Sequence, residues 1–309
     1  MVAACLAILL AAELTVLGLV GACLRARGQP VPEVFGICIL LALSWRAALV
    51  AFGMFVARVD RGLDARGALG RIGAWLSLCL RETGAMSAAY LAMTIEPLRS
   101  VLRRPPPAEG APAIILVHGW CCNAGVWRPV VRRLRRAGLG NVHGVTLHPV
   151  LGCLDAMAAD LERLVSPLRA TWEGRRIVLA AHSMGGLVAR AWLRRLDAVS
   201  RERVSLVTIG TPHCGTRVAA LGAGAAARQM RPGSAWLAGL AAEPDGPADL
   251  TCIGSRADNF VAPQGSAWLP GARAIEVPGV GHFALLMAPA TIDALIAACR
   301  LPQPQGSAG

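Results

Sequence analysis

Two long apolar segments open the chain. Val2–Leu24 and Val34–Val56 each run for 23 residues and contain one charged side chain, Glu13 in the first and Arg46 in the second. At about 1.5 Å per residue, a helix of this length spans about 35 Å, which exceeds the bilayer hydrocarbon core of about 30 Å. The pattern therefore predicts two transmembrane helices.

A polar segment, Arg25–Glu33, separates the two and contains a glycine and two prolines. It predicts a tight turn, and hence an antiparallel hairpin. Glu13 and Arg46 each lie near the middle of their segments, so the hairpin brings them to the same depth. A charge in the membrane interior costs about 2.5–3.5 kcal/mol. Pairing relieves the cost of both charges, so we predict a Glu13–Arg46 ion pair.

A cleaved signal peptide is the alternative interpretation of the first segment, because Val20–Cys23 resembles a lipoprotein cleavage box. The segment lacks a basic start, and its apolar run is longer than the roughly 7–15 residues typical of a signal peptide. A second apolar segment also follows it. These observations favour a membrane anchor.

The arginines around the hairpin favour one orientation. Two stand at the turn and four follow the second segment: Arg25 and Arg27 against Arg58, Arg61, Arg66 and Arg71. Basic residues concentrate on the cytoplasmic side, so we expect both ends of the hairpin in the cytoplasm, in a bacterial inner membrane. The ten cysteines agree with this, since they show neither disulfide-framework nor zinc-site spacing.

A third apolar stretch covers residues 68–96 and is interrupted by Arg71 and by Arg81-Glu82. Its longest uncharged run, Thr83–Ile95, is too short to cross a bilayer. The stretch is typical of an interfacial or packed helix rather than a third span. Arg103–Pro107 then contains three consecutive prolines and predicts a stiff linker.

From Ala111 onward, short apolar runs alternate with amphipathic stretches. Strands are expected at residues 113–117, 142–147, 176–181, 204–209, 250–254 and 273–277, and helices at 128–136, 154–172, 184–196 and 289–299. This alternation predicts an α/β domain with a parallel sheet covered on both faces. The expected organisation is a transmembrane hairpin at 1–60, an interfacial helix and proline-rich linker at 61–110, the α/β domain at 111–301 and a flexible tail at 302–309.

One serine lies where an expected buried strand meets an expected helix. The run Ala181–Gly186 reads Ala-His-Ser-Met-Gly-Gly and places small residues two positions before and after Ser183. This is the context of a nucleophile elbow, with alanine in place of the first glycine of Gly-x-Ser-x-Gly. Ser183 is therefore the candidate nucleophile.

A serine hydroxyl needs a general base, and in elbow proteins the base follows the serine along the chain. His213 and His282 are the histidines that follow Ser183. His213 precedes most candidate acids, whereas His282 stands in a glycine-rich loop between the last expected strand and helix. His282 is therefore the candidate base.

The acid that orients this base is expected at the carboxyl end of a strand. Asp258 follows the strand at 250–254, whereas Asp245 and Asp249 precede it. Asp258 is the candidate acid.

The backbone N–H groups of Trp120 and Met184 are the candidate oxyanion donors, because His118–Trp120 follows the first strand and Met184 begins a helix.

Together these residues resemble the α/β-hydrolase superfamily, and its bacterial lipase and esterase group in particular. The resemblance covers about residues 111–300 and rests on His118-Gly119, Ala181–Gly186, Thr211–Thr216, Asp258 and Gly281-His282. It implies an α/β-hydrolase fold and a lid or cap at residues 217–247. Some lipases of this kind bind calcium, but no acidic cluster assigns a site here, so we expect neither a metal nor a cofactor.

The hairpin and the resemblance together predict a membrane-anchored serine hydrolase. We expect it to cleave carboxylic esters, above all lipid esters, through an acyl-enzyme. An acyltransferase or a thioesterase would use the same residues with a different acceptor or leaving group. A membrane scaffold with a retired hydrolase domain is the alternative outside enzymes, and the complete set of site residues disfavours it.

Composition and charge fit this interpretation. The chain is 55% hydrophobic and 16% charged, and the apolar excess is concentrated in the hairpin. The net charge of +12 comes from 31 basic residues that are all arginine. These arginines are dispersed and aromatic residues make up 5% of the chain, so nucleic-acid binding is not expected.

Overall fold

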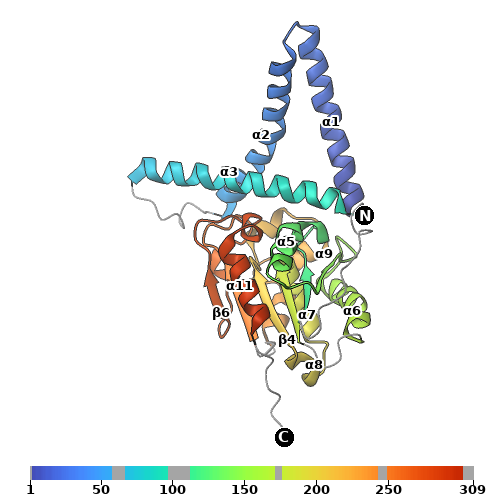
Figure 1. Cartoon of the computed structure of the whole chain (residues 1–309). Helices are drawn as coiled ribbons and strands as arrows, with labels where there is room; N and C mark the ends of the chain where they lie inside the picture. Colours follow the sequence, from blue (N-terminus) through green and yellow to red (C-terminus); the bar gives the residue numbers. More distant parts are fainter. Residues whose placement is uncertain (1, 58–66, 97–111, 171–175, 243–248, 302–309) are drawn as a thin grey trace.

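The computed structural model describes residues 2–57, 67–96, 112–170, 176–242 and 249–301. Figure 1 shows two long helices that project from a layered α/β domain, and a third long helix that crosses between the hairpin and the domain. The expected linker at 103–107, the tail at 302–309 and Arg58, Arg61 and Arg66 lie outside the described residues.

The hairpin consists of α1 (Val2–Ala26) and α2 (Val31–Ala57). Both helices continue further than the hydrophobic pattern predicts, so the turn is shorter than Arg25–Glu33. Gly28, at a φ of 83°, ends α1 in the left-handed conformation that glycine adopts freely. Pro32 lies in the first turn of α2, where the missing N–H has no intrahelical role.

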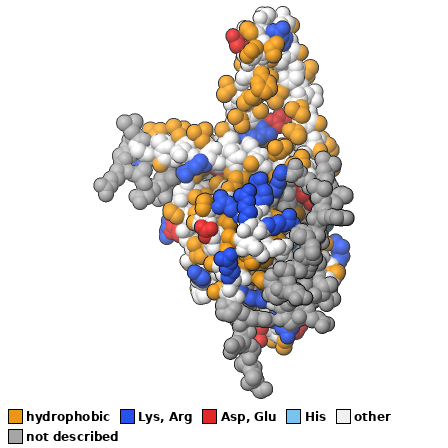
Figure 2. Space-filling view, viewed as in Figure 1, with side chains coloured by type: hydrophobic (Ala, Val, Ile, Leu, Met, Phe, Trp, Pro, Cys, Tyr) orange, Lys and Arg blue, Asp and Glu red, His pale blue; other side chains and the backbone are white. Residues whose placement is uncertain are grey.

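Both hairpin helices are long and apolar enough to cross a membrane. Large apolar side chains on them remain exposed, and Phe55 is 78% accessible. Figure 2 shows many hydrophobic side chains along the visible face of the hairpin.

The predicted ion pair between the helices is confirmed. The Arg46 guanidinium donates two hydrogen bonds to the Glu13 carboxylate, from Nη1 to Oε1 at 2.5 Å and from Nη2 to Oε2 at 2.7 Å. The indole N–H of Trp45 donates a further bond to Oε1 at 3.1 Å. This two-pronged geometry is the strong form of an arginine–carboxylate pair.

The third apolar stretch forms one continuous helix, α3 (Gly67–Thr94), which is packed as expected. Its described apolar side chains divide between two faces. Leu78, Ala85, Ala89 and Met93 are buried, whereas Ile72, Leu76, Leu80 and Leu91 are exposed. The Tyr90 hydroxyl donates to the Leu6 carbonyl of α1 at 2.8 Å, and the Asn123 amide donates to the Met93 carbonyl at 2.9 Å. Helix α3 thus joins the hairpin to the α/β domain.

The domain contains a six-stranded parallel sheet in the order β2-β1-β3-β4-β5-β6. Its strands are β1 (Ala113–Val117), β2 (Val142–Val145), β3 (Ile177–His182), β4 (Val204–Ile209), β5 (Asp249–Gly254) and β6 (Arg273–Glu276). The predicted fold class is therefore correct. Among the strands, the largest boundary difference is in β2, which ends two residues before the expected Leu147.

Two hydrophobic layers cover the sheet. Alternate β1 residues face opposite sides, with Ile115 in one layer and Ile114 in the other. The first layer contains α6 (Leu154–Ala170) and α7 (Met184–Leu193), and the second contains α5 (Arg128–Arg136) and α11 (Pro289–Arg300). Helix α7 ends three residues before the predicted Leu196.

Short helices connect the main elements. The expected lid segment contains η3 (Arg217–Leu221), α9 (Gly224–Gln229) and α10 (Ala235–Ala242), and its last residues lie outside the described part of the chain. Other short helices are η2 (Ala124–Trp127), α8 (Ala198–Glu202), η4 (Gln264–Ala267) and η5 (Ala284–Leu286).

The hairpin pair can be tested by charge reversal. Because the Glu13 and Arg46 side chains are 14% and 9% exposed, we expect Glu13→Arg or Arg46→Glu alone to lower the free energy of unfolding by about 3–5 kcal/mol. The double reversal restores the pair and should recover most of this loss. Thermal unfolding of the full chain in detergent measures both effects. Glu33→Arg, at the exposed start of α2, is the control. A double variant as unstable as the summed single variants would contradict the prediction.

Candidate active site

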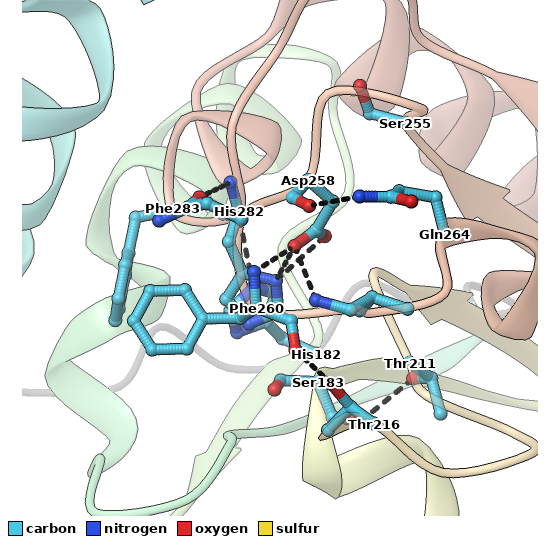
Figure 3. A network of polar contacts seen from close by, with 12 residues as sticks. His182, Ser183, Thr211, Thr216, Ser255, Asp258, Phe260, Gln264, His282 and Phe283 are labelled. Atoms are coloured by element: carbon cyan, nitrogen blue, oxygen red, sulfur yellow. Dashed lines mark hydrogen bonds and ion pairs between the residues drawn. The ribbon is translucent and has the colours of Figure 1, made fainter. Parts of the chain in front are cut away.

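The candidate residues lie on loops at one edge of the sheet. His118–Trp120 follows β1, Ser183 follows β3, Asp258 follows β5 and His282 follows β6. Because all strands are parallel, their carboxyl ends meet at this edge. Figure 3 shows Ser183 close to the Asp258–His282 pair.

Ser183 occupies a strained turn between β3 and α7. Its φ of 57° lies in the left-handed region that residues other than glycine avoid. The turn is held by the Ser183 N–H, which donates to the Ile209 carbonyl at 2.9 Å, and by the Thr211 hydroxyl, which donates to the Ser183 carbonyl at 2.9 Å. A Cβ on Gly185 would lie 2.6 Å from the Val117 carbonyl oxygen, so glycine is required there.

The loop after β1 packs directly against Ser183. A Cβ on Gly119 would lie 2.8 Å from the Ser183 Cβ and 3.3 Å from its Oγ, so the two backbones could not approach as closely with any other residue. Cys121 has a φ of 53°, and the Cys122 N–H closes the turn onto the Gly119 carbonyl at 3.2 Å. Trp120 lies inside this turn. Met184 is the first residue of α7, where backbone N–H groups have no intrahelical acceptor.

His118 stabilises this loop. Its ring accepts a hydrogen bond from the Leu147 N–H at Nε2 (2.9 Å), and its Nδ1 lies 2.8 Å from the Gly119 carbonyl. Burial lowers the pKa of His118 to about 4, so the ring is neutral at physiological pH. The neutral tautomer with hydrogen on Nδ1 satisfies both contacts.

Asp258 and His282 form a buried hydrogen-bonded pair. The His282 Nδ1 lies 2.8 Å from Oδ2 and 3.0 Å from Oδ1 of Asp258. The same carboxylate accepts the N–H groups of Phe260 at 2.8 Å and Val261 at 3.0 Å. Gly210 gives the pair room, since a Cβ there would lie 3.0 Å from Oδ2 and 3.2 Å from Nδ1.

The environment of His282 favours its protonated form. Burial lowers the pKa of the ring, but the charge and hydrogen bond of Asp258, with the charge of Glu82, outweigh this and raise it above its ordinary value. A base with a raised pKa binds the proton of a neighbouring hydroxyl more strongly.

The alternative base and acids have other partners. His213 is buried, its Nε2 lies 3.0 Å from the Thr208 hydroxyl, and burial lowers its pKa to about 3. Asp249 forms an ion pair with Arg176 at 2.5 Å, at the amino end of β5. Asp245 lies outside the described residues.

Two neighbours of His282 were not identified from the sequence. The His182 ring centroid lies 4.5 Å from that of His282, and its Nε2 lies 3.2 Å from the His282 carbonyl. The Asn259 Oδ1 accepts the His282 N–H at 3.1 Å. Both stand next to a predicted site residue in the sequence, which is the signal that could have identified them.

Glu82 of α3 is a further unpredicted neighbour. Its side chain is fully buried and accepts the N–H groups of Phe283 at 2.8 Å and Ala284 at 3.0 Å, directly after His282. Burial raises the pKa of Glu82 to about 7, although the two N–H donors and His282 oppose this rise. In the sequence Glu82 is one of the charges that interrupt an apolar stretch, and nothing local links it to a residue 200 positions later.

An apolar cavity of about 330 Å³ lies over Ser183. Trp120 and Phe260 line it from the domain, Met230 from the segment after α9, and Leu49 and Phe52 from α2. Its volume falls at the lower end of the range for small-molecule sites. Among the described residues, no group of three or more histidine, cysteine, aspartate or glutamate side chains could hold a metal ion.

Comparison with known families agrees with this geometry. Residues 114–263 match the model of a family described as "Alpha/beta hydrolase family". This domain has the α/β-hydrolase fold. The matched residues include β1 through β5 and Ser183, and they end before His282.

Solved structures share the fold of the hydrolase domain. The mature form of Bacillus licheniformis lipase BlEst2 superposes with a TM-score of 0.54 at 17% identity, covering 64% of this chain and 96% of that one. Aspergillus fumigatus lipase B gives a TM-score of 0.58 at 20% identity, covering 67% of this chain and 57% of that one. No curated protein matches the sequence.

The Glu82 contact predicts a change in pH dependence. Glu82→Gln removes the negative charge that Glu82 carries above its pKa of about 7, so the pKa of His282 should fall and the acid limb of the kcat/KM profile should move to lower pH. Gln also accepts the two N–H groups less well than a carboxylate does. If the hydrogen bonds that position the His282 loop lose about 1 kcal/mol in the transition state, kcat/KM falls about fivefold.

The measurement is hydrolysis of p-nitrophenyl acetate between pH 5 and 9. Glu276→Gln, which removes an exposed acid paired with Arg256, should leave the profile unchanged. An acid limb that stays at the wild-type position in Glu82→Gln would show that Glu82 only supports the fold.

Proposed function

We propose that the chain is a membrane-anchored serine hydrolase that cleaves carboxylic esters, above all lipid esters, through an acyl-enzyme. The observation that carries this proposal is the hydrogen-bonded Asp258–His282 pair beside Ser183, at the base of an apolar cavity. An acid–base pair next to a serine hydroxyl that lines a cavity is the arrangement that nucleophilic acyl transfer requires.

Acylation starts at Ser183. Its Oγ attacks the ester carbonyl carbon while Nε2 of His282 accepts the hydroxyl proton. Asp258 keeps the other ring proton on Nδ1, which leaves Nε2 free to accept, and stabilises the imidazolium that forms. The N–H groups of Trp120 and Met184 donate to the oxyanion of the tetrahedral intermediate.

Acylation ends when His282 gives its proton to the leaving alkoxide, and the alcohol departs while the acyl group stays on Ser183. Deacylation then uses the same groups with water as the nucleophile. Water then attacks the acyl carbon as His282 takes one of its protons. Collapse of the second tetrahedral intermediate releases the carboxylic acid and returns the proton to Ser183.

Three features support membrane anchoring. Helices α1 and α2 have the length and hydropathy of membrane spans. The exposed apolar residues of α3 recur at helical spacing opposite its buried face, as expected for a helix in the membrane interface. Figure 2 shows basic side chains gathered below α3, where α5 contributes Arg132, Arg133, Arg135 and Arg136. These suit anionic headgroups.

The nucleophile is tested with a fluorophosphonate probe. We expect the wild-type chain to be labelled and Ser183→Ala to lose both labelling and ester hydrolysis. Ser200→Ala, on α8, should behave as wild type. Asp258→Asn should reduce kcat by about 10³–10⁴-fold, because the ring then takes the wrong tautomer.

An unlabelled wild-type chain, or labelling that persists in Ser183→Ala, would contradict the proposal and favour a scaffold role. Product analysis separates the enzyme alternatives. Free carboxylic acid supports a hydrolase, and acyl transfer to an added alcohol in preference to water supports an acyltransferase. A strong preference for thioesters over oxygen esters supports a thioesterase.

The orientation of the anchor is tested through Cys214, an exposed thiol of the hydrolase domain. With this domain in the cytoplasm, an impermeant maleimide should label Cys214 only after the cells are lysed. Cys214→Ser identifies the signal that comes from this residue. Labelling of Cys214 in intact cells would place the domain on the outer side.

A further inference from the structure

One wall of the cavity over Ser183 does not belong to the hydrolase domain. Leu49, Val50, Phe52 and Gly53 of α2 face the cavity, together with Met86 of α3. The four α2 residues lie 60 or more positions before β1, Met86 lies 27 positions before it, and all five lie outside the segment that matches the hydrolase family. A helix with the properties of a membrane span therefore contributes directly to the candidate substrate site.

This wall is fixed to the domain. The backbone of Gly53 packs against Asn259, whose side-chain nitrogen would lie 3.4 Å from a Cβ at that position. The Gln264 amide donates to the Ala57 carbonyl at 2.8 Å. Val50 and Met54 pack in one cluster with Ala257 and Ala262, on the loop that carries Asp258. The end of α2 is thus held beside the Asp258–His282 pair.

The cavity opens where α2 leaves the domain. Leu49 and Phe52 line the cavity and yet are 53% and 52% exposed. Leu221 of η3 also lines the cavity and is 60% exposed. The mouth is therefore apolar and continuous with the exposed apolar surface of the hairpin.

The lining suits an acyl chain and excludes a charged headgroup. None of the described residues that line the cavity carries a charge. The Thr216 hydroxyl is already satisfied, since it donates to the Phe260 carbonyl at 2.7 Å and accepts the Ala262 N–H at 3.0 Å. A charged group would lose its hydration there without gaining a partner.

We propose that α2 forms the membrane-side wall of an acyl-binding channel, through which the acyl chain of a lipid ester passes from the hydrocarbon layer to Ser183. This inference rests on the proposed ester hydrolase function. It adds that chain-length preference is set by Leu49 and Phe52, outside the hydrolase domain.

The test compares short and long acyl esters. In Leu49→Gln and Phe52→Gln, kcat/KM for p-nitrophenyl decanoate should fall about tenfold, because each methylene that loses apolar contact is worth a factor of about four. Hydrolysis of p-nitrophenyl acetate should fall much less than hydrolysis of the decanoate, since a two-carbon acyl group ends before the mouth, so the decanoate-to-acetate ratio of kcat/KM should drop. Phe55→Gln is the matched control, because Phe55 is exposed on the same helix but does not line the cavity. It should leave both rates unchanged.

A second experiment tests entry from the lipid. The full chain is reconstituted in phosphatidylcholine vesicles that contain p-nitrophenyl decanoate. Adding phosphatidylcholine at constant total ester should lower the decanoate rate in proportion to the surface fraction of ester. The rate for the water-soluble acetate should not change.

The outcomes separate this inference from the function on which it rests. If neither ester is hydrolysed by the wild type, the proposed function fails and the channel fails with it. If acetate is hydrolysed and the decanoate-to-acetate ratio is the same in all variants, the channel alone is refuted. Retained acetate hydrolysis also shows that a variant with low decanoate activity is folded. If the rate of decanoate hydrolysis does not change when phosphatidylcholine is added, entry from the lipid layer is refuted.

Discussion

The site depends on the close approach of backbone segments around Ser183. The serine holds a φ of 57° between β3 and α7, a conformation that costs of order 1–3 kcal/mol and persists only where its surroundings enforce it. Here the segments after β1 and β4 contact the turn. Gly119 packs closely against Ser183, and the Thr211 hydroxyl donates to the Ser183 carbonyl. The parallel register makes this contact unavoidable, because β1 and β4 are the two neighbours of β3 and end at the same edge. The candidate oxyanion donors therefore lie beside the serine as a consequence of the fold.

The loop of His282 is held by a different part of the chain. Glu82 accepts the two N–H groups that follow the histidine, and Asn259 accepts the N–H of the histidine itself. Because Asn259 also packs against Gly53, both restraints lead to helices that precede the hydrolase domain. Displacement of α2 or α3 would consequently loosen the base as well as open the cavity. Helices α2 and α3 are thus packed against the site as one unit, and the two N–H donors satisfy the buried Glu82 carboxylate.

The features that could be predicted from the sequence are those that a local pattern or simple geometry determines. The strand-to-helix context of Ser183 follows from a short apolar run, small residues and an amphipathic helix, all within about 20 positions. The Glu13–Arg46 contact follows from equal depth in a hairpin. Glu82 and the wall formed by Leu49 and Phe52 could not be predicted in this way. Their contacts join segments some 70 to 200 positions apart, and the helical period indicates which residues share a face without indicating what that face will contact.

In the proposed membrane-anchored form, the docking of α2 would also determine how deep the hairpin lies in a bilayer. Its last turns, from Val50 to Ala57, are packed on the domain, which leaves Val31–Leu49 to stand in lipid. At about 1.5 Å per residue this part measures about 27 Å, close to the hydrocarbon thickness. Leu49 then lies at the boundary on the domain side, and Arg46, three residues earlier, lies only about 4.5 Å inside it. The ion pair is therefore nearer to the interface than its position in the middle of the apolar segments suggested. Placing a charge near the interface costs less free energy than placing it at the centre of the bilayer. The cavity mouth lies at the same boundary, so an acyl chain could enter it without leaving the apolar phase.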